Sequence, residues 1–194
     1  MGSRTHNANR IVAAIFAAFF IAVWISFPLA ARGQTPNAEL DGLFERLQAP
    51  GAADWQTVEA EIWRQWSRSG SPAMDLLLER GRQAIQEGDF QAAIEHLTAL
   101  VDHAPDFAEG WNARATAYFQ AGLYGPSLAD IERVLALEPR HFGALSGLAM
   151  ILEEIGRPAQ ALEAWRAAHA IHPNAPGINE ALQRLERQVS GTDI

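Results

Sequence analysis

The 194-residue chain contains neither cysteine nor lysine. Without cysteine there can be no disulfide, thiolate metal site, thiol nucleophile or lipid-modified N-terminal cysteine. All fifteen basic residues are arginines, and three of them lie in residues 1–33, which hold no acid. Because the whole chain carries a net charge of −8, the remainder carries −11. A body this acidic repels phosphate backbones, so the sequence predicts a protein or peptide partner and no nucleic acid.

The sequence also lacks the motifs of common catalytic and cofactor sites. It has no glycine-rich phosphate loop, no paired zinc ligands and no nucleophile elbow. Two pairs of histidines have helical spacing: His96 with His103, and His169 with His172. No cysteine or acid completes either set as a metal site, and histidine near a helix C-terminus is favoured by the helix dipole. We therefore expect no cofactor, no metal and no catalytic residue.

Glycine and proline, by contrast, recur at a fixed interval of 34 residues. The glycines stand at positions 88, 122 and 156, and the prolines at 105, 139 and 173. This interval divides the chain into three blocks: residues 74–107, 108–141 and 142–175. A period of this length is typical of stacked helix-turn-helix units, which form recognition surfaces.

Each repeated position within a block has a physical reason. Apolar residues recur at helical spacing and give each helix one apolar stripe. Small residues at the eighth position, Gly81, Ala115 and Ala149, let paired helices approach closely. The glycine ends the first helix in a left-handed conformation, and the proline stops the second. The expected core residues are Trp111, Tyr118, Leu128, Ile131, Leu148, Leu162 and Trp165.

This combination of landmarks resembles the tetratricopeptide repeat (TPR) family over residues 74–175. The resemblance implies an all-α fold, a TPR-like α-solenoid of three helix-turn-helix repeats: TPR 1 at 74–107, TPR 2 at 108–141 and TPR 3 at 142–175. No single repeat can bury its apolar stripe alone, so the blocks are expected to stack. The predicted helices span residues 74–87, 90–103, 108–121, 125–137, 142–155, 158–171 and 176–189, with turns at the three glycines.

The segments on either side of the blocks are also helical in pattern. Residues 176–194 carry apolar residues at helical spacing and are expected to form a capping helix and tail. Residues 34–73 are expected to hold a linker and a pair of helices, which is either an N-terminal cap or a degenerate fourth repeat. The cap is favoured because the glycine and proline landmarks are missing.

Three tryptophans fall within this N-terminal pair: Trp55, Trp63 and Trp66. Their density is compatible with an exposed hot spot for a partner. Packing against the first repeat is the favoured interpretation, because most large aromatic residues on periodic stripes lie in the core.

Residues 1–33 have the order of a signal peptide. A polar start with two arginines precedes the uncharged, apolar residues 11–31, and small residues around Ala31 and Gly33 fit a cleavage site. The apolar segment is also long enough to span a bilayer, so an inner-membrane anchor is the alternative. Both interpretations predict a periplasmic body with membrane contact only through residues 11–31. We expect residues 11–27 to form a helix that stays apart from the repeats.

In the TPR family, the first helix of each repeat lines a concave face that binds partner segments. The resemblance places the partner-binding residues at Leu78, Arg82, Ile85, Asn112, Thr116, Phe119, Met150 and Glu153. The family's clamp for a peptide carboxylate uses lysine, asparagine and arginine, and among the matching positions only Arg82 is suitable. Apolar residues with an acidic rim instead suit an apolar segment with basic flanks.

The sequence thus predicts a non-catalytic protein–protein interaction adaptor of the bacterial cell envelope. The alternatives are a membrane-anchored assembly factor, an accessory subunit of an envelope enzyme, and a hydrolase using Glu153, Glu154 or the histidines. The missing catalytic set argues against a hydrolase, because adjacent acids on a helix point in different directions.

Overall fold

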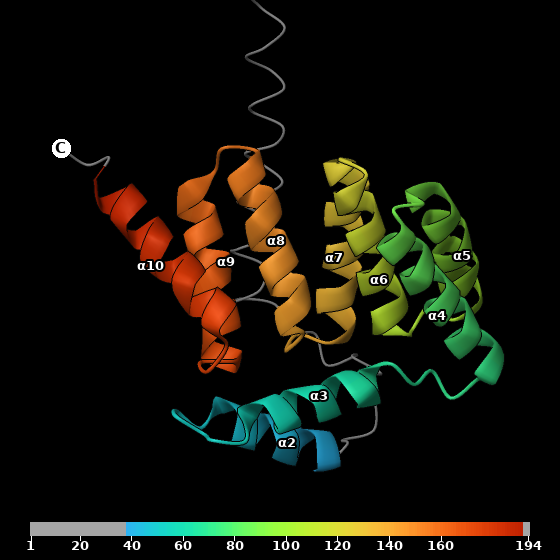
Figure 1. Cartoon of the computed structure of the whole chain (residues 1–194), viewed down its shortest axis with the longest axis horizontal. Helices are drawn as coiled ribbons and strands as arrows, with labels where there is room; N and C mark the ends of the chain where they lie inside the picture. Colours follow the sequence, from blue (N-terminus) through green and yellow to red (C-terminus); the bar gives the residue numbers. More distant parts are fainter. Residues whose placement is uncertain (1–37, 192–194) are drawn as a thin grey trace, which may run out of the picture. The chain divides into compact units, whose positions relative to one another are not determined.

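The structure, a computed structural model, describes residues 38–191, and this part of the chain contains nine α-helices and no strand (Figure 1). The helices are α2 (Ala38–Gln48), α3 (Trp55–Trp66), α4 (Pro72–Glu87), α5 (Phe90–His103), α6 (Ala108–Gln120), α7 (Tyr124–Leu137), α8 (Phe142–Glu154), α9 (Pro158–Ile171) and α10 (Pro176–Ser190). The seven helices predicted from the period are confirmed, with ends that differ by two residues or fewer. The signal peptide or anchor and the helix expected at 11–27 lie outside the described residues.

Helices α4 to α9 form three antiparallel pairs that stand side by side in chain order, with α10 against the last pair (Figure 1). The first helix of each later pair contacts both helices of the pair before it, α6 against α4 and α5, and α8 against α6 and α7. This is the stacking that a solenoid requires, because each pair buries the apolar stripe of its neighbour. We call α4 to α10 the stack.

The three repeated glycines end the first helix of each pair. Gly88, Gly122 and Gly156 have φ angles of 77°, 73° and 73°, the left-handed region that favours glycine. The next residue donates its N–H back to a carbonyl in the preceding turn: Asp89 to Ala84, Leu123 to Tyr118, and Arg157 to Leu152. This six-residue closure satisfies carbonyls that the helix end leaves open, so the sequence position of each turn is confirmed.

The small residue at the eighth position of a block lies where two helices meet. A Cβ placed on Gly81 would come within 2.5 Å of Leu97 Cγ, so only glycine lets α4 approach α5 this closely. Of the expected core residues, Ile131, Leu162 and Trp165 are buried. The other four are half-buried: Trp111, Tyr118, Leu128 and Leu148. Trp111 keeps one face outward because its indole N–H donates to Pro105 O at 2.9 Å and Arg114 lies 4.9 Å from its ring centre.

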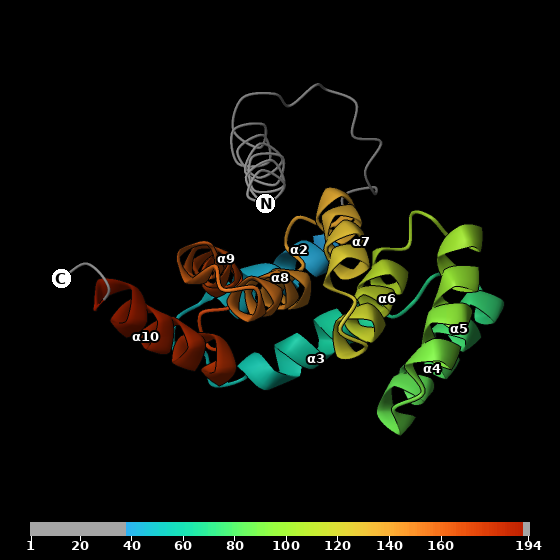
Figure 2. The same ribbon diagram turned by 90° about the horizontal axis from the view of Figure 1, so that it is seen from above.

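The α2–α3 pair, here called the hairpin, crosses the ends of helices in the second and third pairs (Figures 1 and 2). Asn174, after α9, donates to the carbonyls of Leu47 and Ala49 and accepts the N–H of Gly51. Arg140, before α8, donates to Asp41 at 2.8 Å. The hairpin therefore neither extends the stack as a repeat would nor covers the outer side of α4, where Leu76 stays 45% exposed.

The hairpin tryptophans pack where the second block meets the third, and against the end of the third, and not against the first block, which corrects the expectation from sequence. Trp66 stacks on His141, with ring centres 4.1 Å apart and planes 8° apart. Trp63 meets Phe142 edge-on at 5.3 Å. The pattern of apolar residues showed that this pair had one buried side, but it held no information about which block would cover it.

The described helices are all too short or too polar to cross a lipid bilayer. Residues 11–31, where the sequence predicts membrane contact, lie outside this part of the chain.

Candidate partner-binding face

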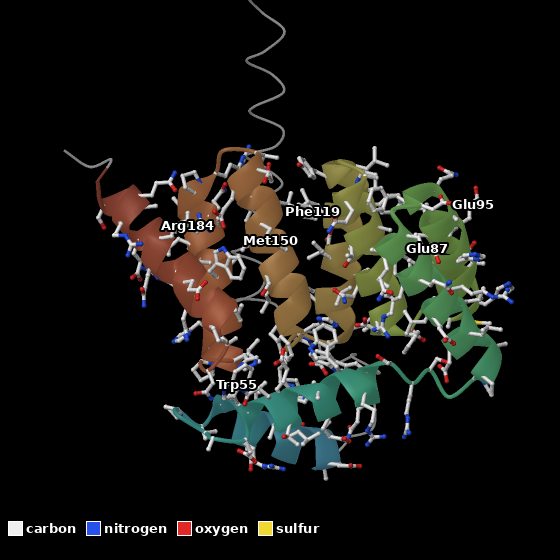
Figure 3. All side chains as sticks on the ribbon, viewed as in Figure 1. Trp55, Glu87, Glu95, Phe119, Met150 and Arg184 are labelled. Carbon is white, nitrogen blue, oxygen red and sulfur yellow. The ribbon has the colours of Figure 1, made fainter. Side chains whose placement is uncertain are left out.

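The predicted partner-binding residues lie on the first helices of the three pairs, α4, α6 and α8, which contact one another in turn. Figure 3 shows two of them, Phe119 and Met150, on the stack, away from the hairpin that carries Trp55. We call the side formed by these three helices the A face. The structure brings the predicted residues onto one set of neighbouring helices, but their surroundings differ.

Leu78 is a core residue and cannot anchor a partner, which corrects its assignment to the face. Its side chain is 2% exposed and belongs to the same apolar cluster as Leu97, Leu100 and Ala113. This position on the first helix of a pair lies at the border between the open side of the helix and the side that packs against the next pair. Periodicity alone does not separate these two directions.

Apolar surface on the A face comes mainly from Met150, which is 40% exposed. Phe119 and Ile85 are half-buried, and the Phe119 ring centre lies 5.7 Å from that of Tyr124. Thr116 is exposed, and its hydroxyl donates to Asn112 O at 3.0 Å within α6. These side chains offer moderate apolar area with polar groups between them.

A buried carboxylate, Glu109 on α6, gathers the polar side chains near the start of the A face. It is 3% exposed and accepts hydrogen bonds from Arg82 Nη2, Asn112 Nδ2 and His141 Nε2, the last at 3.0 Å. His141 Nδ1 accepts the Ala144 N–H at 3.1 Å, so the proton of the neutral ring is on Nε2, where it can be donated to Glu109. A buried carboxylate is stable here because three donors surround it.

This network also changes the role of Arg82. Its guanidinium donates both to Glu109 and to the hydroxyl of Ser67 at 3.0 Å. Arg82 and Asn112 therefore hold a carboxylate of their own chain, and the cation expected to meet a partner is already paired.

Glu153, expected at the acidic rim, is likewise engaged within the stack. It accepts a hydrogen bond from Trp165 Nε1 at 2.8 Å and forms an ion pair with Arg184 on α10. The Arg184 guanidinium holds the pKa of Glu153 below its ordinary value. Glu79 and Glu154 are exposed on α4 and α8 and supply the negative charge of the face.

One edge of the A face is closed by the hairpin. The Trp63 ring lies over Gly143 at the start of α8, so close that a Cβ on residue 143 would be 2.7 Å from Trp63 Cη2. Ser67, one residue past α3, reaches Arg82 on α4. Arg82 and Gly143 therefore contact the hairpin or the residue that follows it, which narrows the open part of the A face.

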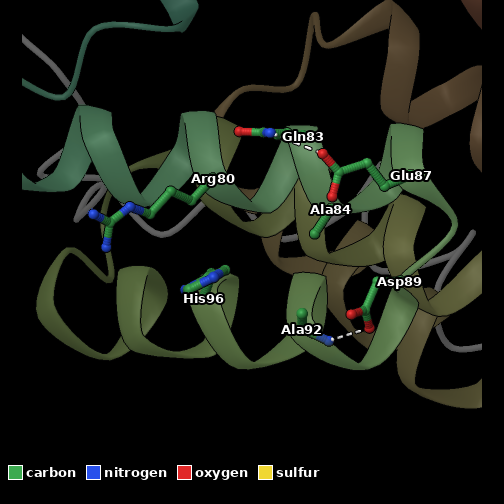
Figure 4. A pocket seen from close by; sticks show the side chains of 7 residues that line it. All are labelled: Arg80, Gln83, Ala84, Glu87, Asp89, Ala92 and His96. Atoms are coloured by element: carbon green, nitrogen blue, oxygen red, sulfur yellow. Dashed lines mark hydrogen bonds between the residues drawn. The ribbon is translucent and has the colours of Figure 1, made fainter.

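Two open hollows lie on the first pair. One, of about 630 Å³, is lined by Ser67, Asp75, Leu78, Glu79, Arg82, Gln83, Gln86 and Glu87, and it continues the A face along α4. The other, of about 340 Å³, lies between α4 and α5. Figure 4 shows Arg80 and His96 on the two walls near one end of it, with Glu87 and Asp89 near the other.

Residues 38–191 contain no group of three or more metal-ligating side chains of the kind that could hold an ion. The two histidine pairs noted in the sequence, His96 with His103 and His169 with His172, lie in different surroundings, as one member of each shows. His172 is fully buried at the hairpin contact, with its ring centre 5.3 Å from that of Trp55, whereas His103 is exposed at the end of α5.

Comparison with known proteins agrees with this architecture. Residues 78–125 and 127–176 match the family model described as tetratricopeptide repeat. A TPR repeat-containing protein of Rhizobium etli is 39% identical over 158 residues, which are 81% of this chain and 78% of that protein. Small glutamine-rich tetratricopeptide repeat-containing protein 2 of Saccharomyces cerevisiae is 27% identical over 131 residues, 68% of this chain but only 37% of the yeast protein.

Solved structures show the same fold at low sequence identity. The Sgt2 TPR domain from Aspergillus fumigatus matches with a TM-score of 0.60 at 22% identity, over 63% of this chain and 83% of that chain. The first TPR of Spaghetti (RPAP3), bound to an HSP90 peptide, matches with a TM-score of 0.59 at 20% identity, over 62% and 95%. At this identity the likeness establishes the arrangement of helices and nothing finer.

Proposed function

Because the chain belongs to the tetratricopeptide repeat family, we propose that it is a non-catalytic adaptor that binds a segment of another protein on the A face. The observation that carries this proposal is the pairing of exposed apolar surface at Met150 with exposed acids on the same helices. The RPAP3 domain of the same fold was solved with a bound HSP90 peptide, which supports peptide binding as the general mode.

The partner segment should be apolar with basic flanks. Arg82 is paired with Glu109, and Arg184 with Glu153, so neither cation is free to receive a peptide carboxylate. Exposed Glu79 and Glu154 and the net charge of −11 outside residues 1–33 instead attract arginine or lysine. Apolar anchors should set most of the affinity, whereas the rim charges should mainly change the association rate.

A direct test uses two synthetic peptides that share one apolar centre and differ only in their flanks, arginine in one and glutamate in the other. The arginine peptide should bind, and Phe119→Ala or Met150→Ala should weaken binding by at least about 1 kcal/mol. Leu123→Ala is the matched control, because Leu123 is 46% exposed but lies in the turn after α6. Equal binding of both peptides would remove the preference for basic flanks, and equal losses in all three variants would remove the A face as the site.

Salt dependence tests the electrostatic part of the same proposal. Glu153→Arg would also break the contacts of Glu153 with Trp165 and Arg184, so Glu154→Arg is the cleaner change. It should slow association at low salt and have little effect at high salt, because exposed charges are screened. An affinity that stays the same at both salt concentrations would show that the rim does not steer the partner.

The place of action that we propose is the bacterial cell envelope, and this rests on residues 1–33 alone. Either a cleaved signal peptide or an anchored assembly factor fits the apolar segment 11–31. A reporter fused after Asn37 should be exported, and replacing Ala18 with arginine in the apolar segment should abolish export. Export that survives this change would remove the envelope from the proposal, and the mass of the mature protein would distinguish cleavage from anchoring.

The hydrolase alternative finds less support at Glu153, the first residue named for it. Glu153 lies in an ion pair and a hydrogen bond that hold α8 to α9 and α10. A general acid or base needs a carboxyl that can reach a substrate proton, and Glu153 is occupied. The accessory-subunit reading remains a form of adaptor, with an enzyme as the partner.

A further inference from the structure

The contact between hairpin and stack contains polar groups that have no hydrogen-bond partner. Four buried side-chain nitrogens in residues 38–191 lack one: Trp66 Nε1, His169 Nδ1, and both ring nitrogens of His172. Three of the four belong to Trp66 and His172, which the docked hairpin helps to bury. A buried polar group without a partner loses its hydrogen bonds to water and gains nothing in return. Docking of the hairpin is therefore less favourable than its apolar area suggests.

His172 lies between aromatic rings and a single acid. Trp55 on α3 and Phe142 on α8 meet its ring edge-on, with ring centres 5.3 and 5.2 Å away. The charged group that faces it is Glu59 on α3, whose carboxylate oxygen is 3.7 Å from Nε2, too far for a hydrogen bond. Burial lowers the pKa of His172, and the Glu59 carboxylate offsets this only in part.

Docking also depends on the close approach of the Trp63 ring to Gly143. The ring sits where a side chain at residue 143 would stand, and no other residue type fits there without moving the ring. Inside the stack, the buried polar side chains between α5, α6 and α7 have partners, whereas His169 Nδ1 on α9 does not. Arg114 donates twice to Asp130 and once to Thr98, and buried Ser127 donates to Ala115 O at 2.8 Å.

We propose that the hairpin is a releasable latch. It detaches as one unit from the start of α8 and the end of α9 while the stack stays folded, and acid favours this release. Opening would uncover Trp63, Trp66 and Phe142 and would extend the A face by the first turn of α8. This inference goes beyond the adaptor function, because it concerns the chain alone and holds whether or not the A face binds a peptide.

The direction of the pH effect follows from the burial of His172. The docked state holds the ring neutral, whereas release returns it to water, where histidine titrates near pH 6.5. Above that pH both states bind the same number of protons, and docking keeps its full stability. As the pH falls below about 6.5, His172 becomes protonated in the released state but not in the docked state, so docking weakens. This weakening stops once the pH is below the lowered pKa of His172 in the docked state.

The absence of cysteine gives a clean measurement of release. Ala60 on α3 and Ala121 after α6 are both exposed, so spin labels on Ala60→Cys and Ala121→Cys report one distance between hairpin and stack in the full chain in detergent. We expect one narrow distance at pH 7.5. At pH 5.5 a second, longer distance should appear, with an open-to-closed ratio about five to ten times larger. Helicity by circular dichroism should stay constant.

Two glycines of α8 supply a matched pair of variants. Gly143→Ala should raise the open population at pH 7.5 at least about tenfold, because its methyl group would stand 2.7 Å from the Trp63 ring. Gly147→Ala adds the same methyl group on the same helix, but its nearest neighbour is Ile131 Cδ1 at 3.5 Å, an ordinary contact. The second variant should leave the distance distribution unchanged.

The histidine is tested by His172→Phe, which should keep the hairpin docked and remove the response to pH. Glu59→Gln, at a half-buried position, should enlarge the response by removing the acid that faces the ring. The latch is overturned if one distance persists at both pH values and in Gly143→Ala. It is also overturned if helicity falls together with the new distance, or if the pH response survives in His172→Phe.

Discussion

The stack and the hairpin are built from the same kind of helix but are held in place by different kinds of contact. In the stack, each pair repeats the plan of the one before it, with a small residue where its two helices meet and a left-handed glycine at the turn, and the buried polar groups between α6 and α7 find partners. The hairpin makes contacts that occur once: Trp66 on His141, Trp63 on Gly143, and Asn174 on the turn after α2.

The difference shows what repetition contributes to stability. A repeated interface allows each pair to be stabilised by its neighbours, so the folding free energy of the stack is approximately a sum of similar contributions from each pair and each interface. The hairpin has one docking surface, made of the start of α8 and the end of α9, and it leaves Trp66 and His172 with unpaired nitrogens. We therefore expect the stack to unfold as the more stable part and the hairpin to open first.

The largest effect should come from the centre of the stack. Leu97 is fully buried between α4 and α5, so Leu97→Ala should lower the free energy of unfolding by about 2–5 kcal/mol. Urea titration followed by circular dichroism measures this as a shift of the main transition. A shift below about 1 kcal/mol would mean that the first pair does not unfold with the rest of the stack.

Ile62→Ala makes the matching change in the hairpin, where Ile62 is also fully buried. It should accelerate amide hydrogen exchange throughout residues 38–66, while the main urea transition shifts by less than half of the Leu97→Ala value. If both variants shift that transition equally, hairpin and stack form one cooperative unit and the distinction drawn above is wrong.

A smaller effect is expected at Trp111, which the sequence placed in the core. Full burial would make Trp111→Ala cost about 3–5 kcal/mol. Because the ring is half-buried and Arg114 lies over it, we expect a loss of about 2 kcal/mol in the same urea experiment. A loss above about 3 kcal/mol would show that this ring supports the stack more than its exposure indicates.

The period of 34 residues was enough to predict every helix of the stack and all three glycine turns, because each landmark acts within its own block. The period could not show that Leu78 is buried, since periodicity identifies the apolar stripe of a helix but not whether a neighbouring helix covers the edge of that stripe. The pairing of Arg82 with Glu109 was also out of reach, because Glu109 lies 27 residues away in the next block. The docking of the hairpin was the least predictable feature, since a single contact between distant segments leaves no repeat in the sequence.

The smallest effect concerns the ion pair that joins α10 to the stack. Glu153 has a lowered pKa because of Arg184, so the pair stabilises the capping helix fully above the ordinary glutamate pKa of about 4.5, and this contribution is lost as the pH falls through the lowered pKa of the folded state. Glu153→Gln should cost about 0.5 kcal/mol at pH 7, since Arg184 is half-exposed. Amide exchange in α10 measures this loss, and an equal loss at pH 3 would show that it does not come from the ion pair.

The position of the hairpin also sets an order of events during synthesis. Residues 38–66 leave the ribosome first, but the residues that cover them, from His141 to Asn174, follow roughly a hundred positions later. At usual rates of translation this delay is on the order of ten seconds. Throughout that time Ile62, Trp63 and Trp66 have no finished surface to pack against, so the nascent chain presents an aromatic, aggregation-prone segment until its last repeat has been made.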